Sequence, residues 1–149
     1  MAGYACVDES CQVVTRAGPR SIGDIRIGDE VLTPGGEFRR VIDKDFGRIW
    51  NQRRNDYVQI STPAGSIVLT RDHFIGGRPA GEWGDGGAMT LRSGEVASVT
   101  VRPATSEVSG DLRLEGEADY VTAEGFVVGS MLSRYAASQR AGGLVQRQP

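Results

Sequence analysis

Short runs of β-branched and aromatic residues, each ended by glycine, proline or aspartate, recur along the sequence and limit its fold more than any other feature. Runs of this length and composition are typical of strands, and the 21 glycines leave little room for helices. The sequence therefore predicts an all-β fold. The expected strands cover residues 12–15, 29–33, 38–43, 57–61, 66–70, 96–101, 112–114 and 124–128.

The joints between these strands carry the residues that tight turns need. Pro63-Ala64-Gly65 separates the runs YVQIS and SIVLT, and Pro34-Gly35-Gly36 separates EVLT from EFRRVID, so each is expected to join neighbouring strands. The glycine-rich stretch 76–87, GGRPAGEWGDGG, is expected to form a long loop beside any site. Residues 130–141 are expected to form a short helical turn, followed by a tail that does not fold alone.

Length and charge narrow the function classes. A chain of 149 residues and 16.0 kDa fits one domain with a real core. Acidic and basic residues are interspersed and the net charge is -2, so neither a nucleic acid nor a membrane is expected as a partner. No apolar window reaches the roughly 20 residues of a membrane span, and the first residues lack a signal-peptide pattern. These features predict a soluble intracellular protein.

Two cysteines and one histidine are too few for a disulfide framework or a good zinc site, so a catalytic thiol is the chemistry to consider. Thr70 and His73 follow the run SIVLT in the order Thr-x-x-His, and Cys6 lies just before another strand. Cysteine is a strong nucleophile, histidine can pass a proton to a departing amide nitrogen, and a threonine hydroxyl can hold a peptide in position. A thiol at Cys6 can thus attack the carbonyl of Ala5 and form a thioester.

Each of these residues also has an ordinary structural explanation. A lone histidine is usually a hydrogen-bonded structural residue, and a cysteine near a terminus is more often a small buried apolar group. Thr-x-x-His alone occurs by chance in many proteins, and Cys11 is expected to be structural. The surrounding residues are therefore needed to decide between a catalytic and a structural role for Cys6, Thr70 and His73.

Two longer blocks supply that context. CVDESCQVVTRAGPRSIGDIRIGDEVLT, which starts at Cys6, resembles the opening block of Hint domains, the module shared by inteins and Hedgehog autoprocessing domains. IVLTRDHFI resembles the second block, a strand that ends in Thr-x-x-His. The resemblance implies an all-β, pseudo-symmetric horseshoe over residues 6–137, with residues 1–5 as an N-terminal flank and 138–149 as a tail. It also implies Cys6 as nucleophile, Thr70 as a peptide-positioning hydroxyl and His73 as proton donor to the amide nitrogen, all near one rim.

Later segments extend the resemblance. VIDKDF places Asp43 where Hedgehog processing domains carry an aspartate that activates the second nucleophile, which implies a base for the second step at Asp43. An exposed charge at the end of a strand is the alternative for Asp43. LRSGEV resembles the family's L-x-x-G-D turn with Glu95 in place of the aspartate, and YVTAEGFVVGSMLSRYAA resembles the closing strand without the cysteine often found there.

The end of the chain limits which reaction the resemblance implies. Splicing finishes by cyclising an asparagine that follows a histidine at the last strand, but the only histidine here is His73 and the last asparagine is Asn55. The resemblance is thus closest to Hedgehog-type autoprocessing domains or to bacterial intein-like domains that lack the C-terminal His-Asn. It implies a single-turnover acyl shift at Ala5-Cys6 without splicing, with the thioester resolved by water, an amine, a thiol or an alcohol. The substrate would be the protein's own N-terminal flank, and no metal or organic cofactor is implied.

Two other functions stay open at this point. Only five residues precede Cys6 in this sequence, so the chain is expected either to belong to a larger precursor or to have kept the fold for another purpose. In the second case, a catalytically idle Hint-like domain would serve as a structural subunit of a larger assembly such as a phage particle, held by protein partners. The protein would then be part of a virion rather than cytoplasmic. A generic β-barrel binding module, with residues 76–87 as its contact surface, is the other alternative.

Overall fold

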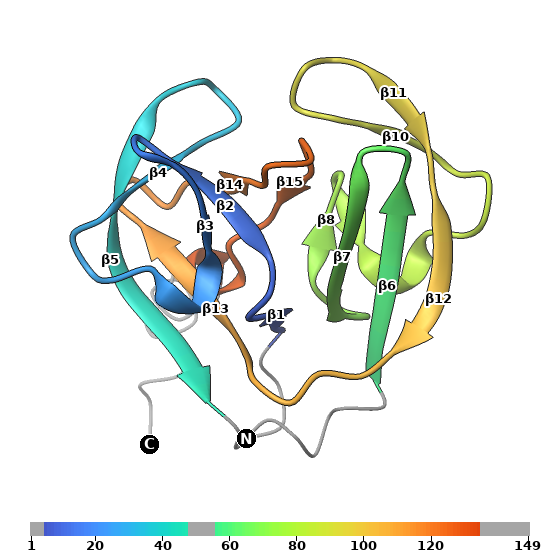
Figure 1. The fold of residues 1–149 in the computed structure, drawn as a ribbon, viewed down its shortest axis with the longest axis horizontal. Helices are drawn as coiled ribbons and strands as arrows, with labels where there is room; N and C mark the ends of the chain where they lie inside the picture. The colour runs from blue at the N-terminus through green and yellow to red at the C-terminus, as the bar shows by residue number, and fades with distance from the viewer. Residues whose placement is uncertain (1–4, 48–55, 135–149) are drawn as a thin grey trace, which may run out of the picture.

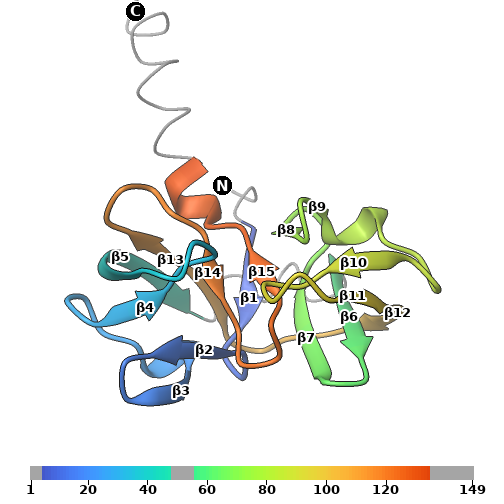
Figure 2. The same cartoon turned by 90° about the horizontal axis from the view of Figure 1, so that it is seen from above.

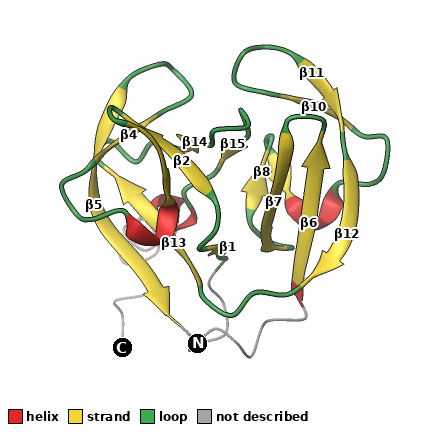
Figure 3. Cartoon of the chain, in the orientation of Figure 1, coloured by secondary structure: helices red, strands yellow, loops and turns green. Residues whose placement is uncertain are grey.

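The computed structural model describes residues 5–47 and 56–134, and strands make up about half of this part of the chain (Figure 3). Helical turns include η1 (Ile22–Asp24), η3 (Ala80–Glu82) and a short helix over residues 131–134. Within these ranges, no helix is long and apolar enough to cross a membrane. The predicted all-β class is confirmed, and the short helix lies within the predicted helical turn at 130–141; residues 135–141 fall outside the described residues.

The strands form one large sheet and two smaller ones. The large sheet contains β1 (Val7–Asp8), β2 (Gln12–Thr15), β3 (Gly18–Ser21), β4 (Glu30–Leu32), β5 (Phe38–Gly47), β6 (Tyr57–Thr62), β7 (Gly65–Thr70), β12 (Thr100–Ala104) and β13 (Ser109–Leu114). The smaller sheets contain β8 (Phe74–Ile75), β9 (Arg78–Pro79), β10 (Ala88–Thr90), β11 (Val96–Ser98), β14 (Tyr120–Val121) and β15 (Val127–Val128). The strand orders are β12-β6-β7-β1-β13-β5-β4-β2-β3, β10-β11 and β14-β15-β8-β9.

β1 connects the two lobes of the molecule. Figure 1 shows one lobe formed by β2 to β5 with β13, and another formed by β6, β7 and β10 to β12. β1 lies between them in both views (Figure 1, Figure 2). Val7 pairs with Leu69 of β7 on one side and with Gly110 of β13 on the other, antiparallel in both cases. A strand of two residues therefore joins the two halves of the large sheet.

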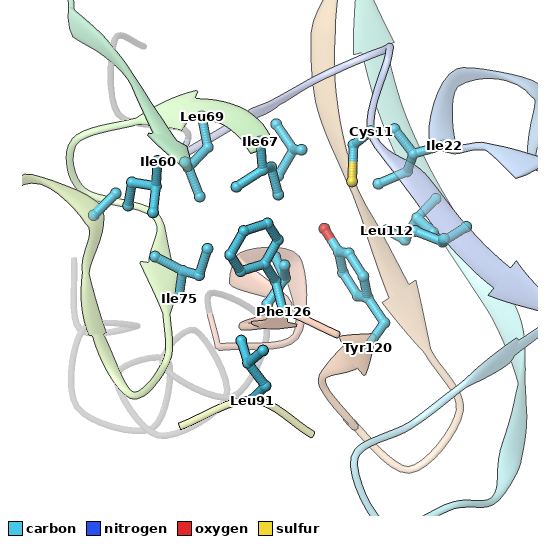
Figure 4. Packing of buried hydrophobic residues seen from close by; sticks show 14 of the residues in the cluster. Cys11, Ile22, Ile60, Ile67, Leu69, Ile75, Leu91, Leu112, Tyr120 and Phe126 are labelled. Atoms are coloured by element: carbon cyan, nitrogen blue, oxygen red, sulfur yellow. The ribbon is translucent and has the colours of Figure 1, made fainter. Parts of the chain in front are cut away.

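A single apolar core lies under both lobes. Figure 4 shows Phe126 and Tyr120 between side chains of the second lobe, such as Ile60, and side chains of the first, such as Cys11 and Leu112. All of these side chains are buried and belong to one contiguous cluster. Burying a large apolar side chain contributes about 1.5 to 3 kcal/mol, so residues 120–128, which bring two such rings to the centre, hold the lobes together.

The predicted hairpins are present, and the glycine in each has a physical reason. In the β6–β7 hairpin, Thr62 pairs with Gly65, which leaves Pro63 and Ala64 as the loop. Gly65 has a φ of 143°, a conformation that side chains with a Cβ rarely adopt. Gly36 has a φ of 92° in the turn between β4 and β5.

The strand predicted at 124–128 is only β15 at its end, because residues 123–124 form a turn, and two further predictions need correction. Residues 76–87 are not an irregular loop, because β9 pairs with β8, η3 follows, and Trp83 is buried with its indole N–H donating to the carbonyl of Ile75 at 2.9 Å. The single predicted strand at 96–101 is two strands. β11 pairs with β10 and β12 pairs with β6, so the chain changes sheets at the buried Val99, which alternation of residue types cannot reveal.

Candidate active site

Cys6 and Thr70 form a direct contact at the junction of the lobes. Thr70, the last residue of β7, accepts a hydrogen bond from the backbone N–H of Cys6 through its hydroxyl Oγ1 at 2.9 Å, and its own N–H donates to the carbonyl of Cys6 at 2.9 Å. Its carbonyl oxygen accepts instead from the N–H of His73 at 3.1 Å, because the chain turns there. The hydroxyl thus replaces a backbone acceptor for the amide nitrogen of the Ala5-Cys6 bond. All three of these residues are buried.

His73 is held in one orientation by its neighbours. Its backbone carbonyl accepts from the N–H of Ala80 at 2.8 Å, and its ring Nε2 lies 2.7 Å from the carbonyl oxygen of Gly129. A carbonyl oxygen only accepts, so Nε2 carries a proton, and in the neutral ring Nδ1 is the unprotonated nitrogen. Nδ1 is buried and has no hydrogen-bond partner among the residues that the structure describes. The ring therefore presents one nitrogen that is free to take or give a proton.

A buried carboxyl group, Asp111 on β13, lies beside this ring. Its Oδ1 is 3.9 Å from His73 Nε2 and accepts a hydrogen bond from the hydroxyl of Tyr120 at 2.5 Å. Its Oδ2 accepts from the backbone N–H groups of Met131 at 2.6 Å and Leu132 at 2.9 Å, at the start of the short helix. Cys6 and Asp111 are the chain neighbours of the paired residues Val7 and Gly110, at the same end of the antiparallel β1–β13 pair.

Burial shifts both ionisable groups toward their neutral forms. Burial lowers the pKa of His73, and the nearby Asp111 charge and the Gly129 hydrogen bond oppose this only in part. Burial likewise raises the pKa of Asp111, against the opposing influence of His73 and the donated hydrogen bonds. A neutral imidazole with a free Nδ1 acts first as a base and, once protonated, as an acid.

Asp43 lies in a different environment. It is exposed on β5, where it pairs with Arg113 of β13, and its Oδ1 accepts from the backbone N–H of Lys44 at 2.8 Å. Among the described residues, no hydrogen bond joins Asp43 to Cys6, Thr70 or His73. Of the two explanations for Asp43, the structure thus shows the exposed charge on a strand. A catalytic role for Asp43 stays a prediction.

The second cysteine lies in the core. Cys11 packs in the same apolar cluster as Ile22 and Leu112, and burial raises its thiol pKa far above the ordinary value. A thiol that stays protonated is a poor nucleophile and a poor metal ligand. In residues 5–47 and 56–134, no group of three or more His, Cys, Asp or Glu side chains is placed to hold a metal ion.

Sequence reasoning missed three members of this site: Asp111, Tyr120 and the carbonyl of Gly129. A signal for Asp111 is present, because SGDLRL sets an acidic residue inside a short apolar run, and buried acids in strands are rare unless paired. The role of Gly129 had no such signal, since a backbone carbonyl is the same at every residue.

Comparison with known proteins agrees with this architecture. No family model and no curated protein matches the chain. Among solved structures, the gp41-1 intein has a TM-score of 0.70 at 16% identity, covering 86% of this chain and 100% of that one. A bacterial intein-like domain from Clostridium thermocellum has a TM-score of 0.69 at 16% identity, with coverage of 86% and 99%. The MchDnaB-1 intein has a TM-score of 0.67 at 18% identity, with coverage of 83% and 99%. The chain therefore has the Hint fold of inteins and intein-like domains.

Proposed function

We propose that the chain is a self-processing domain that moves the acyl group of Ala5 from the nitrogen of Cys6 to its sulfur and does not splice. The observation that carries this proposal is the hydrogen bond from the Cys6 N–H to Thr70 Oγ1, because it holds the amide nitrogen that would leave in a buried position. The free Nδ1 of His73 supports the acyl shift, and the intein names of several solved structures with this fold support the self-processing role.

The first step follows from the charge states at the site. Neutral His73 takes the thiol proton of Cys6 through Nδ1, and the thiolate attacks the carbonyl carbon of Ala5. As the carbon–nitrogen bond breaks, protonated Nδ1 returns the proton to the nitrogen of Cys6. The products are a thioester between Ala5 and the Cys6 sulfur and a free amine on Cys6, so atoms and protons balance without a cofactor.

The second step releases the flank. Water, an amine, a thiol or an alcohol attacks the thioester carbonyl and regenerates the Cys6 thiol, and Asp43 is proposed only as a base for that nucleophile. Cyclisation of an asparagine is not part of the proposed reaction, because residues 56–149 contain no asparagine that could carry it out.

The test is intact-mass spectrometry of the full chain carrying a longer N-terminal fusion. We expect release of the fusion to be stimulated by dithiothreitol and, with hydroxylamine, to give a hydroxamate at Ala5. Cys6→Ala should abolish release, and His73→Gln should slow it by about 10² to 10⁴, the usual contribution of a general acid or base.

Cys11→Ala is the matched control, because it removes the other buried thiol and should still release the fusion. Release that persists in Cys6→Ala would rule out this mechanism. No release from the wild-type fusion under any condition would favour the structural-subunit function instead, and a search for the assembly that holds the domain.

A further inference from the structure

The carbonyl that fixes His73 belongs to a segment near the C-terminal end of the described chain. β15 pairs with β8 through Val128 and Ile75, and the next residue, Gly129, donates its N–H to the carbonyl of Phe74 at 2.9 Å. The carbonyl of Gly129 then accepts the Nε2–H of His73 at 2.7 Å. The position of this one backbone group therefore decides which ring nitrogen carries the proton.

Arg134 holds the segment around Gly129 against Phe74 of β8, the residue that follows His73. Its guanidinium lies 4.5 Å from the ring centre of Phe74, and its NH2 group is 3.2 Å from Asp119 Oδ2. The other oxygen of Asp119 accepts the N–H of Ser130 at 3.0 Å. We call Asp119, Ser130 and Arg134, together with Phe74, the C-terminal clasp.

The clasp fits closely around Gly129. A Cβ built on Gly129 would lie 2.9 Å from the Cβ of Phe74 and 3.0 Å from the guanidinium of Arg134. No side chain can therefore occupy this position unless the clasp moves. The clasp thus packs directly on the residue whose carbonyl meets His73.

We propose that Arg134 is a positioning residue for His73, acting through the clasp to hold the Gly129 carbonyl on Nε2 and so keep Nδ1 as the unprotonated nitrogen. The effect of Arg134 on the rate of release rests on the proposed acyl shift, because in that reaction the unprotonated Nδ1 takes the proton of the Cys6 thiol. Among residues 5–47 and 56–134, the charged groups that act on the His73 ring are Asp111, Asp72 and Arg134 itself.

A second cluster of the same make-up provides the control. The guanidinium of Arg16, in the turn between β2 and β3, lies 4.6 Å from the ring centre of Phe38 on β5. It also forms an ion pair with Glu30 on β4, so the whole cluster belongs to the first lobe. Both clusters combine an arginine, a phenylalanine face and a carboxylate, but Arg16 is not among the groups that act on His73. Replacing either arginine should lower the free energy of unfolding. Only replacement of Arg134 should change which nitrogen of the His73 ring carries the proton.

The test uses the fact that His73 is the only histidine of the chain, so a sample labelled with ¹⁵N-histidine reports on this ring alone. In the wild type we expect a protonated Nε2 and an unprotonated Nδ1 at neutral pH. Arg134→Met should populate both tautomers, Arg134→Lys should restore part of the wild-type pattern, and Arg16→Met should match the wild type. If Arg134→Met does not fold, Asp119→Asn takes its place, because the amide oxygen still accepts from Ser130 while the ion pair is lost.

Wild-type tautomers in Arg134→Met, or a protonated Nδ1 in the wild type, would overturn the proposal. In the fusion assay, Arg134→Met should slow release by about ten- to a hundredfold, the effect of a catalytic group displaced by about 1 Å, while Arg16→Met should not slow it. Absence of release from the wild-type fusion would refute the proposed function, while the nitrogen shifts still decide whether the clasp sets the tautomer.

Discussion

Replacing Thr70 by valine separates the proposed chemistry from the fold. Valine keeps the β-branched shape of the last residue of β7 but removes the hydroxyl that accepts the Cys6 N–H at 2.9 Å. A buried N–H without a partner costs about 1 to 3 kcal/mol, so the free energy of unfolding should fall by that amount. Release slows only where the hydroxyl stabilises the transition state more than the folded ground state, since the nitrogen must then stay in line with its proton donor. An extra loss of about 1 to 3 kcal/mol in the transition state would slow release by roughly 5- to 150-fold.

Thr122→Val is the matched variant for this experiment. Thr122 is also buried, and its hydroxyl also accepts a backbone N–H, from Phe126 at 3.1 Å. Urea denaturation should show a similar loss of stability in the two variants, while the time course of release by mass spectrometry should be slower only in Thr70→Val. Equal release rates in Thr70→Val and the wild type, or equal slowing in both variants, would refute a role of the hydroxyl in positioning the peptide.

Three further predictions follow from burial and close contact. Because the pKa of His73 is lowered in the folded state, the unfolded chain binds more protons at this residue below about pH 6.5, so the contribution of His73 to stability should fall as the pH drops from about 7.5 to 5.5, by at most about 1.4 kcal/mol per pH unit. The raised pKa of Asp111 acts in the opposite direction, so the comparison is with His73→Gln: over this range urea titrations should show a greater loss of stability in the wild type, and an equal change in both proteins would contradict the burial argument. Cys11, whose thiol pKa is raised by burial, should resist iodoacetamide at pH 8 in the native protein and react in urea, as peptide mass mapping can show; modification in the native state would contradict its assignment as a core residue. Gly110→Ala should lower stability by about 3 kcal/mol or more, because its Cβ would lie 1.9 Å from the carbonyl oxygen of Asp45; a melting temperature close to that of the wild type would show that β5 can shift to make room.

The sequence predicted those parts of the fold that depend on local residue types. The strand at Gln12–Thr15 has the predicted bounds, and β6 and β7 differ from the prediction by one residue each, because runs of β-branched residues and a Pro-Ala-Gly turn determine them locally. Residues 76–87 were predicted wrongly because glycine content indicates turns but says nothing about a buried tryptophan that anchors them.

The site was predictable only where side-chain chemistry shows in the sequence. Cys6, Thr70 and His73 could be named from residue type and spacing, and the structure joins Cys6 to Thr70 directly. The pairing of β1 with β13, which sets Asp111 near His73, links residues about a hundred positions apart and depends on the whole sheet. No local pattern carries such a contact.

The shortness of β1 bears on what remains after one turnover. The paired residues of this strand, Val7 and Asp8, both lie on the C-terminal side of the Ala5-Cys6 bond, so cutting that bond removes none of the strand that joins the lobes. The remaining chain would be a folded protein that begins with a cysteine, in which amine and thiol sit on one residue. A 1,2-aminothiol of this kind captures an added thioester by the reverse of the acyl shift. The spent domain would thus be a ready acceptor for ligation at its own N-terminus.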